Sequence, residues 1–223
     1  MTPRPLTGLC ITIMWLFQTA PSSSESEVLS RHVALDGSTR TSVDAMSLML
    51  AQASVPGGII SVSNGCTSPN PRAFPLAETT LKDGLDYVST IDPARKWSYG
   101  ERLILIGMEH ANSTILNTVI NDVEIQPGDA LTLSTQRLVH TSEVQASIQR
   151  AGLEEISPEL GFGQIPRNPK PASPETSKPI HLHQVTLVKA LNTLALTKGT
   201  AVWEYEQSTC NGKSSFRLDW VVR

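Results

Sequence analysis

One pattern occurs twice in this chain and sets the strongest limit on what it can fold into. Residues 80–88 read T-L-K-D-G-L-D-Y-V and are followed, nine residues later, by Trp-Ser-Tyr at 97–99. Residues 186–194 read T-L-V-K-A-L-N-T-L and are followed at the same distance by Trp-Glu-Tyr at 203–205. Agreement of this kind is not expected by chance in a chain with only 4 Trp. The repeat therefore predicts a duplicated structural unit.

The first copy of the pattern lies in a stretch where helix and strand signals alternate. Leu81, Leu85 and Val88 are spaced i, i+4, i+7 and form one apolar face of a helix, which either of two preceding threonines can cap. Around this helix, residues 33–106 read as strand, helix, strand, strand, helix, strand, strand. This order predicts an α+β fold built from split βαβ-type units, each a small mixed sheet with helices packed on one face.

Two such units are expected, the first over 33–108 and the second, more divergent, over 116–223. The second begins with a strand, then a helix whose first turn contains Pro127, then a short helix over 142–151. Residues 157–179 contain six Pro, which disfavours regular structure and predicts an extended, mobile surface insertion. A strand, the repeated helix and a closing hairpin follow. The strand that should come after the first helix of this unit has no counterpart in the sequence.

The N-terminal residues have the features of a secretory signal peptide. Arg4 is the only charge in this region, and the apolar run over 9–17 is too short to span a bilayer. A small-residue site follows, so we expect cleavage after Ser22 and removal of residues 1–22. An uncleaved N-terminal anchor is the alternative.

The composition of the remaining chain argues against two classes of partner. It keeps 17 Lys and Arg against 21 Asp and Glu, a net charge of −4, and has no basic block, which disfavours nucleic acid. No later segment approaches the roughly 20 apolar residues of a membrane helix. We therefore expect a secreted or periplasmic protein without membrane contact after signal cleavage.

Two cysteines, Cys66 and Cys210, remain after the predicted cleavage, each in a loop-like sequence. In an oxidising compartment such a pair indicates a disulfide, which here would tie the two units together. The alternative is two free thiols whose loops never meet. The sequence does not decide between them, because it does not give the separation of the two Cα atoms.

The repeated helix and the closing hairpin resemble the secretin and TonB short N-terminal (STN-like) domain family. Residues 80–85 and 186–191 match the T-L-x-x-A-L helix of that family, with Gly84 in place of the usual Ala. The resemblance covers 33–106 well and 116–223 only in its second part. It implies two divergent copies of an extracytoplasmic protein-interaction module, without catalytic residues.

No recognisable catalytic or metal-binding motif stands out. His181 and His183 lie two apart on one face of a predicted strand and could share a metal ion. No acidic residue or cysteine is close in sequence, which favours a solvent-facing pair. The sequence contains neither a G-x-S-x-G nucleophile elbow nor a phosphate-binding loop. We expect no enzymatic activity, no cofactor and no metal.

The aromatic residues of the two W-x-Y strands allow two interpretations. Trp and Tyr in each strand share a face, since they are two residues apart. That face either packs on the apolar helix of the repeat or forms an exposed platform for carbohydrate. We expect packing, by these repeat residues: Leu81, Leu85, Trp97, Tyr99, Leu187, Leu191, Trp203 and Tyr205.

These observations predict a secreted or periplasmic, non-enzymatic interaction module that binds a protein or cell-envelope partner, by strand addition at an open sheet edge. The alternative is a secreted hydrolase or carbohydrate-binding protein that uses the insertion at 157–179 as a lid. Exposure of Trp97 and Trp203 would favour the alternative, and burial of both would remove its main support.

Overall fold

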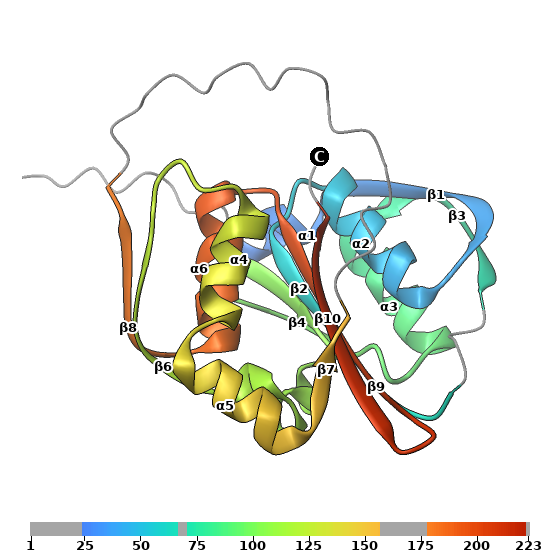
Figure 1. The fold of residues 1–223 in the computed structure, drawn as a ribbon. Helices are drawn as coiled ribbons and strands as arrows, with labels where there is room; N and C mark the ends of the chain where they lie inside the picture. The colour runs from blue at the N-terminus through green and yellow to red at the C-terminus, as the bar shows by residue number, and fades with distance from the viewer. Residues whose placement is uncertain (1–23, 67–70, 157–177, 222–223) are drawn as a thin grey trace, which may run out of the picture.

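The computed structural model of the chain describes residues 24–66, 71–156 and 178–221 (Figure 1). Helices and strands both occur throughout these residues, so the predicted α+β class is confirmed. The predicted signal peptide and nearly all of the insertion at 157–179 lie outside the described residues. In the ranges given, no helix is long and apolar enough to cross a lipid bilayer.

The first unit contains the predicted order of elements, preceded by a short helix that the sequence did not reveal. Thr80 is the N-cap of the repeat helix, and its hydroxyl accepts a hydrogen bond from the Asp83 amide at 3.1 Å. The elements are α1 (Glu25–Leu29), β1 (His32–Arg40), α2 (Ser42–Gln52), β2 (Gly57–Asn64), β3 (Arg72–Thr80), α3 (Leu81–Ile91), β4 (Trp97–Gly100) and β5 (Leu103–Ile106).

The second unit follows two short 3-10 helices and has a helix, α5 (Ser142–Ala151), with no counterpart between the equivalent strands of the first. The placement of Pro127 in a helix is wrong: a turn in which the Asp129 amide donates to the Gln126 carbonyl at 3.1 Å separates β6 from α4. The elements are η1 (Met108–Ser113), η2 (Ile115–Asn117), β6 (Val119–Ile125), α4 (Leu131–Val139), α5 (Ser142–Ala151), β7 (Leu153–Glu155), β8 (Ile180–Thr186), α6 (Leu187–Lys198), β9 (Val202–Cys210) and β10 (Lys213–Val221).

The strand missing from the sequence prediction is β7. It runs parallel to β10, with Leu153 opposite Ser214, one residue after the start of β10. Strand β2 has the same place in the first unit: it runs parallel to β5, with Gly57 opposite Ile104, one residue after the start of β5. The two units therefore share the complete order of strands, and α5 is an addition to the second.

The two units join in one six-stranded sheet with the order β4-β5-β2-β9-β10-β7. The first three strands belong to the first unit and the last three to the second. The joint between the units is the parallel pair β2–β9, which runs in constant register from Gly57 opposite Val202 to Asn64 opposite Thr209. Each unit thus completes the sheet of the other.

The helices of the two units lie on opposite faces of this sheet, which Figure 1 shows nearly edge-on between them. Ile59 points into the core with α2 and α3, whereas its neighbour Ile60 points into the core with α4, α5 and α6. Strand directions are reversed as well. Strand β4, the counterpart of β9, is antiparallel to β5, and β5 is parallel to β2, so β4 runs opposite to β2. Strand β9 is parallel to β2 and therefore runs opposite to its counterpart. The units are therefore related by a half turn about an axis that runs across the strands, combined with a shift along the sheet.

Two antiparallel ribbons, β1–β3 and β6–β8, flank the helix layers, one in each unit (Figure 1). Val33, Leu35 and Phe74 of the first ribbon point inward toward α2 and α3 and are buried. Ile120 and Leu182 of the second ribbon pack in the same way against the helices of its unit. Both ribbons are thus held by one apolar face.

Candidate functional site

The repeat motif forms the same polar contacts in both units. The Trp97 indole N–H donates to Asp86 Oδ1 at 2.9 Å, and the Trp203 indole N–H donates to Asn192 Oδ1 at 3.0 Å. Asp86 and Asn192 occupy equivalent positions in their helices, which the sequence motif left as a variable position. In the sequence, the polar residue that both copies share at this position of the motif was the signal that could have identified the hydrogen-bond acceptor. Each tryptophan is therefore anchored to its own repeat helix, α3 or α6.

The packing residues of the motif are not equally buried. All four leucines are fully buried, and Trp203 and Tyr205 are 0% and 1% exposed, whereas Trp97 and Tyr99 are partly exposed. Burial raises the pKa of the Tyr205 hydroxyl, which donates to Gln207 Oε1 at 2.7 Å. An aromatic platform made by both strands is therefore not formed at the surface.

Trp203 also closes the joint between the units, where it lies over Gly58 of β2. These two residues are opposite each other in the parallel pair. A Cβ atom on Gly58 would lie 2.1 Å from two ring carbons of the indole, so only glycine leaves space for this ring. The Trp203 ring thus packs directly on the backbone of β2 across the joint.

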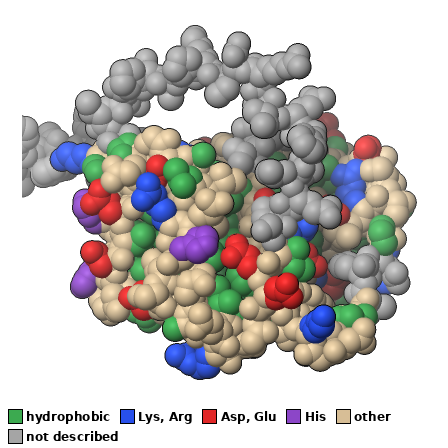
Figure 2. Space-filling model, viewed as in Figure 1, with side chains coloured by type: hydrophobic (Ala, Val, Ile, Leu, Met, Phe, Trp, Pro, Cys, Tyr) green, Lys and Arg blue, Asp and Glu red, His purple; other side chains and the backbone are tan. Residues whose placement is uncertain are grey.

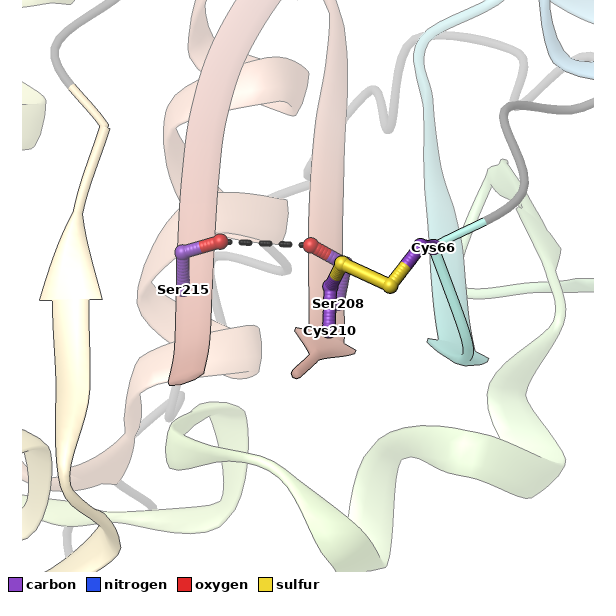
Figure 3. The surroundings of a disulfide bond; sticks show 4 residues. All are labelled: Cys66, Ser208, Cys210 and Ser215. Carbon is purple, nitrogen blue, oxygen red and sulfur yellow. Dashed lines mark hydrogen bonds between the residues drawn. A yellow bond between two sulfur atoms is a disulfide. The ribbon is translucent and has the colours of Figure 1, made fainter. Parts of the chain in front are cut away.

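The structure contains the disulfide between Cys66 and Cys210, one of the two interpretations that the sequence left open. Cys66 follows the end of β2, and Cys210 is the last residue of β9 (Figure 3). Their Cα atoms are 4.7 Å apart. Beside the bridge, the hydroxyls of Ser208 and Ser215 lie 3.2 Å apart and link β9 to β10. The disulfide closes the β2–β9 joint at the end opposite Gly58.

His181 and His183 lie on the outer face of β8 and are both exposed. Glu124 and Asp122 of β6 are their cross-strand neighbours, and His181 Nδ1 lies 3.4 Å from Glu124 Oε2. Figure 2 shows imidazole and acidic side chains together along the left margin, over these strands. Within the described residues, no three His, Cys, Asp or Glu side chains are placed to hold a metal ion.

A partly buried carboxyl that the sequence analysis missed lies on the other face of β9. Glu204 is the middle residue of the second W-x-Y, so its side chain points away from the two aromatics and toward α2 of the first unit. The Ser47 hydroxyl, in the middle of α2, donates a hydrogen bond to Glu204 Oε1. A charged residue within an apolar strand, together with a serine within an apolar helix face, was the available signal.

Glu204 borders a cavity of about 250 Å³ between the start of α2 and the sheet. Asp44, Glu206 and Arg217 also line this cavity. Burial raises the pKa of the Glu204 carboxyl, the Ser47 hydrogen bond lowers it, and the Asp44 and Asp219 carboxylates raise it further. The joint between the units therefore contains a carboxyl group whose ionisation is less favourable than in the unfolded chain.

We expect Glu204→Gln to stabilise the protein at neutral pH but not at acidic pH. A carboxyl whose pKa is higher in the folded than in the unfolded chain adds stability at pH values below the unfolded value, near 4.5, and loses it as pH rises through the folded pKa. Glutamine can still accept the Ser47 hydrogen bond and never ionises. The melting temperature of the variant should exceed that of the wild type by a few °C at pH 7.5 and equal it near pH 4.

Glu206→Gln is the matched control, since Glu206 lies on the same face of β9 but is 44% exposed and paired with Arg217 at 3.4 Å. Its melting temperature should follow the wild type at both pH values, because exposed ion pairs contribute little. A Glu204→Gln variant that is less stable than the wild type at pH 7.5 would contradict the unfavourable burial of this carboxylate.

The most regular open edges of the fold belong to the β6–β8 ribbon. Its ladder runs without a shift from Val119 opposite Thr186 to Ile125 opposite Ile180, with Gln184 as its one residue of positive φ. Neither strand has a second strand partner within the described ranges.

The β1–β3 ribbon is also unpaired at its edges but is less suited to accept another strand. Its register shifts between Val33 and Leu35 and again between Asp36 and Thr39. Pro75 in β3 lacks a backbone N–H. Shifts and prolines of this kind make a strand edge a poor template for further pairing. The β6–β8 ribbon is therefore the candidate interaction site.

The sequence analysis placed His181 and His183 on one strand face and favoured a solvent-facing pair, and the structure puts both on the outer face of the ribbon. Whether β8 has an open edge depends on which strands pair with it. The sequence did not identify β6 as its partner, because the insertion at 157–179 lies between the two strands in the chain.

Comparison with protein-family models, with curated proteins and with solved structures finds no match to this chain.

Proposed function

We propose that the protein is an extracytoplasmic, non-enzymatic interaction module that binds an extended segment of a partner protein by strand addition to the β6–β8 ribbon. The observation that carries the proposal is the unshifted ladder of this ribbon, which has no second strand partner in the part of the chain that the structure describes. An added strand would gain main-chain hydrogen bonds along seven residues of β6 or β8.

The disulfide and the repeated units support this proposal. A bridge such as Cys66–Cys210 forms and persists in oxidising compartments, which fits export from the cytosol. The resemblance of the repeated sequence pattern to the STN-like domain family, whose members are extracytoplasmic interaction modules, points to the same kind of function. The carbohydrate-binding alternative has less support, because Trp203 and Tyr205 are buried in the core.

Site-specific photo-crosslinking in the native compartment tests this assignment. A photoreactive phenylalanine at His183, exposed on β8, should crosslink one partner polypeptide, and the adducts should fall within one extended segment of it. The same amino acid at His32, exposed on the β1–β3 ribbon, is the matched control and should give no adduct with that partner.

Two results would overturn the proposal. One is the recovery of the same partner segment from both positions, which would show that the β6–β8 ribbon is not selected. The other is turnover of a substrate by the purified protein that a single polar substitution abolishes, which would make the protein an enzyme.

A further inference from the structure

A second cavity, of about 250 Å³, lies at the end of the joint opposite the disulfide. Arg31 and the end of α2 line it from one side, and the turn between β4 and β5, with Arg102, lines it from another. Leu196 and Gly199 at the end of α6 complete the wall, so both units contribute to it. We call it the two-arginine pocket.

The charged residues of this pocket are all positive among those that the structure describes: its lining there contains Arg31 and Arg102 and no acidic residue. Arg31 Nη1 donates to the carbonyl oxygens of Ala53 at 2.8 Å and Ser54 at 3.1 Å, which fixes the guanidinium at the end of α2. The side chain of Arg102 is exposed and forms no hydrogen bond or ion pair with the described residues. The pocket thus has one anchored and one free guanidinium.

Arg102 is held at the pocket by an unfavourable turn. Glu101 and Arg102, which join β4 to β5, have φ values of 51° and 68°. The equivalent turn in the second unit is Asn211–Gly212, with φ values of 52° and 76°. Two-residue hairpin turns with positive φ at both positions favour Asn-Gly, and long side chains there are strained. The β4–β5 turn therefore keeps a strained backbone at the position of the free Arg102 side chain. Backbone strain of this kind is concentrated at functional positions.

The other wall residues of the pocket and the two helix ends beside it restrict the class of ligand that can bind there. Val28, Val55 and Leu196 are apolar wall residues, and Leu196 is 36% exposed. The C-terminal ends of α2 and α6 meet here, and each carries roughly half a negative charge, which disfavours a doubly charged anion. A cavity of about 150 Å³ holds benzene, so this one has space for a short apolar tail and a planar acid group.

We propose that the two-arginine pocket binds a monoanionic carboxylate that carries a compact apolar tail. The guanidinium of Arg102 pairs with the carboxylate in the planar geometry that arginine favours, with Arg31 as second donor. The hydroxyl groups of Tyr99 and Ser54, which also line the pocket, are further donors. The apolar tail lies against Val55 and Leu196. This site is separate from the β6–β8 ribbon, so either proposal can fail without the other.

Calorimetric titration of the purified, disulfide-bonded protein tests this site with four probes: hexanoate, phenylacetate, hexan-1-ol and inorganic phosphate. The two carboxylates should bind saturably at one site, with Kd of about 1 mM or tighter for ligands of this size. Hexan-1-ol and phosphate should each bind at least about tenfold more weakly, because one lacks the charge and the other lacks the tail.

Substitutions in the turn give the decisive comparison. Arg102→Gln should weaken hexanoate binding about tenfold, whereas Lys213→Gln, beside the equivalent turn of the second unit, should leave it unchanged. Glu101→Asn combined with Arg102→Gly should raise the melting temperature and abolish binding, since it relieves the turn and removes the free guanidinium. A purely structural role for Arg102 would not produce opposite changes in stability and binding.

Four results would overturn the proposal. Hexanoate affinity that is unchanged in Arg102→Gln would place the ligand elsewhere. Equal binding of hexan-1-ol would show that the pocket selects apolar volume alone. Absence of saturable heat with both carboxylates, or tighter binding of phosphate, would reject the ligand class.

Discussion

Gly58→Ala should destabilise the protein by about 3 kcal/mol or more, the upper range for overpacking a core, and lower its melting temperature by roughly 10 °C. The added Cβ would lie 2.1 Å from Cε2 and Cζ2 of Trp203. The indole cannot move away, because it is fully buried and its N–H is bonded to Asn192 at 3.0 Å. Thermal and urea unfolding, followed by tryptophan fluorescence, would measure the loss.

Gly128→Ala is the matched control, since among the described residues, its two chain neighbours aside, no atom lies within 4 Å of the Cβ that it would add. Its stability should stay within about 0.5 kcal/mol of the wild type, as for most surface substitutions. Combining Gly58→Ala with Trp203→Leu should cost less than the sum of the two single changes, because the smaller side chain makes room for the methyl group. Equal stability of Gly58→Ala and Gly128→Ala would show that Trp203 does not lock the joint.

Removal of the disulfide should have the second large effect. The bridge spans 144 residues of sequence, and closing a loop of this length in the unfolded chain is worth up to about 5 kcal/mol in the chain-entropy estimate. We expect the double substitution Cys66→Ser with Cys210→Ser to lower the urea midpoint substantially. The tryptophan spectrum of the folded state should not change, because the contact of Trp203 with Gly58 lies at the other end of the joint.

Reduction of the wild-type protein provides the control for this experiment. A reductant should shift the wild-type midpoint to that of the double variant and should leave the double variant unchanged. Equal midpoints of the oxidised and reduced wild type would mean that the bridge contributes nothing to stability.

Local signals explain what could be predicted from the sequence. The helix α3 could be located because its cap at Thr80 and its apolar face, Leu81, Leu85 and Val88, lie within nine consecutive residues. Strand β7 could not be located, because its three residues, Leu-Glu-Glu, have no strand pattern of their own. They form a strand because β10 provides a parallel partner more than fifty residues away.

The packing at the joint between the units could not be predicted from the local sequence for the same reason. Gly57 and Gly58 begin β2. Glycine is required there because Leu50, Ile104 and Trp203 approach the strand closely. Paired glycines before an apolar run are also typical of such close approach in a strand. That interpretation needs the partner strand, which belongs to the other unit.

The candidate sites show the same limit at the level of single side chains. Glu204 is only a spacer in the W-x-Y motif, and its burial depends on α2, which covers the opposite face of β9 from the other unit. Arg102 has the sequence context of an ordinary exposed turn residue. Arg102 lines the same pocket as Arg31 because α2 ends beside the β4–β5 turn.

The reversed, face-swapped relation between the units has a consequence for self-assembly. A half turn combined with a shift does not close on itself, so repeating it would extend the sheet without limit. The two ends of the sheet, β4 and β7, are the counterparts of β9 and β2, the strands that meet in the middle. However, β4 has four residues and β7 three, whereas β2 and β9 pair over eight. Short edge strands are poor templates for association. The fold therefore limits its own polymerisation by ending in strands too short to repeat the central joint.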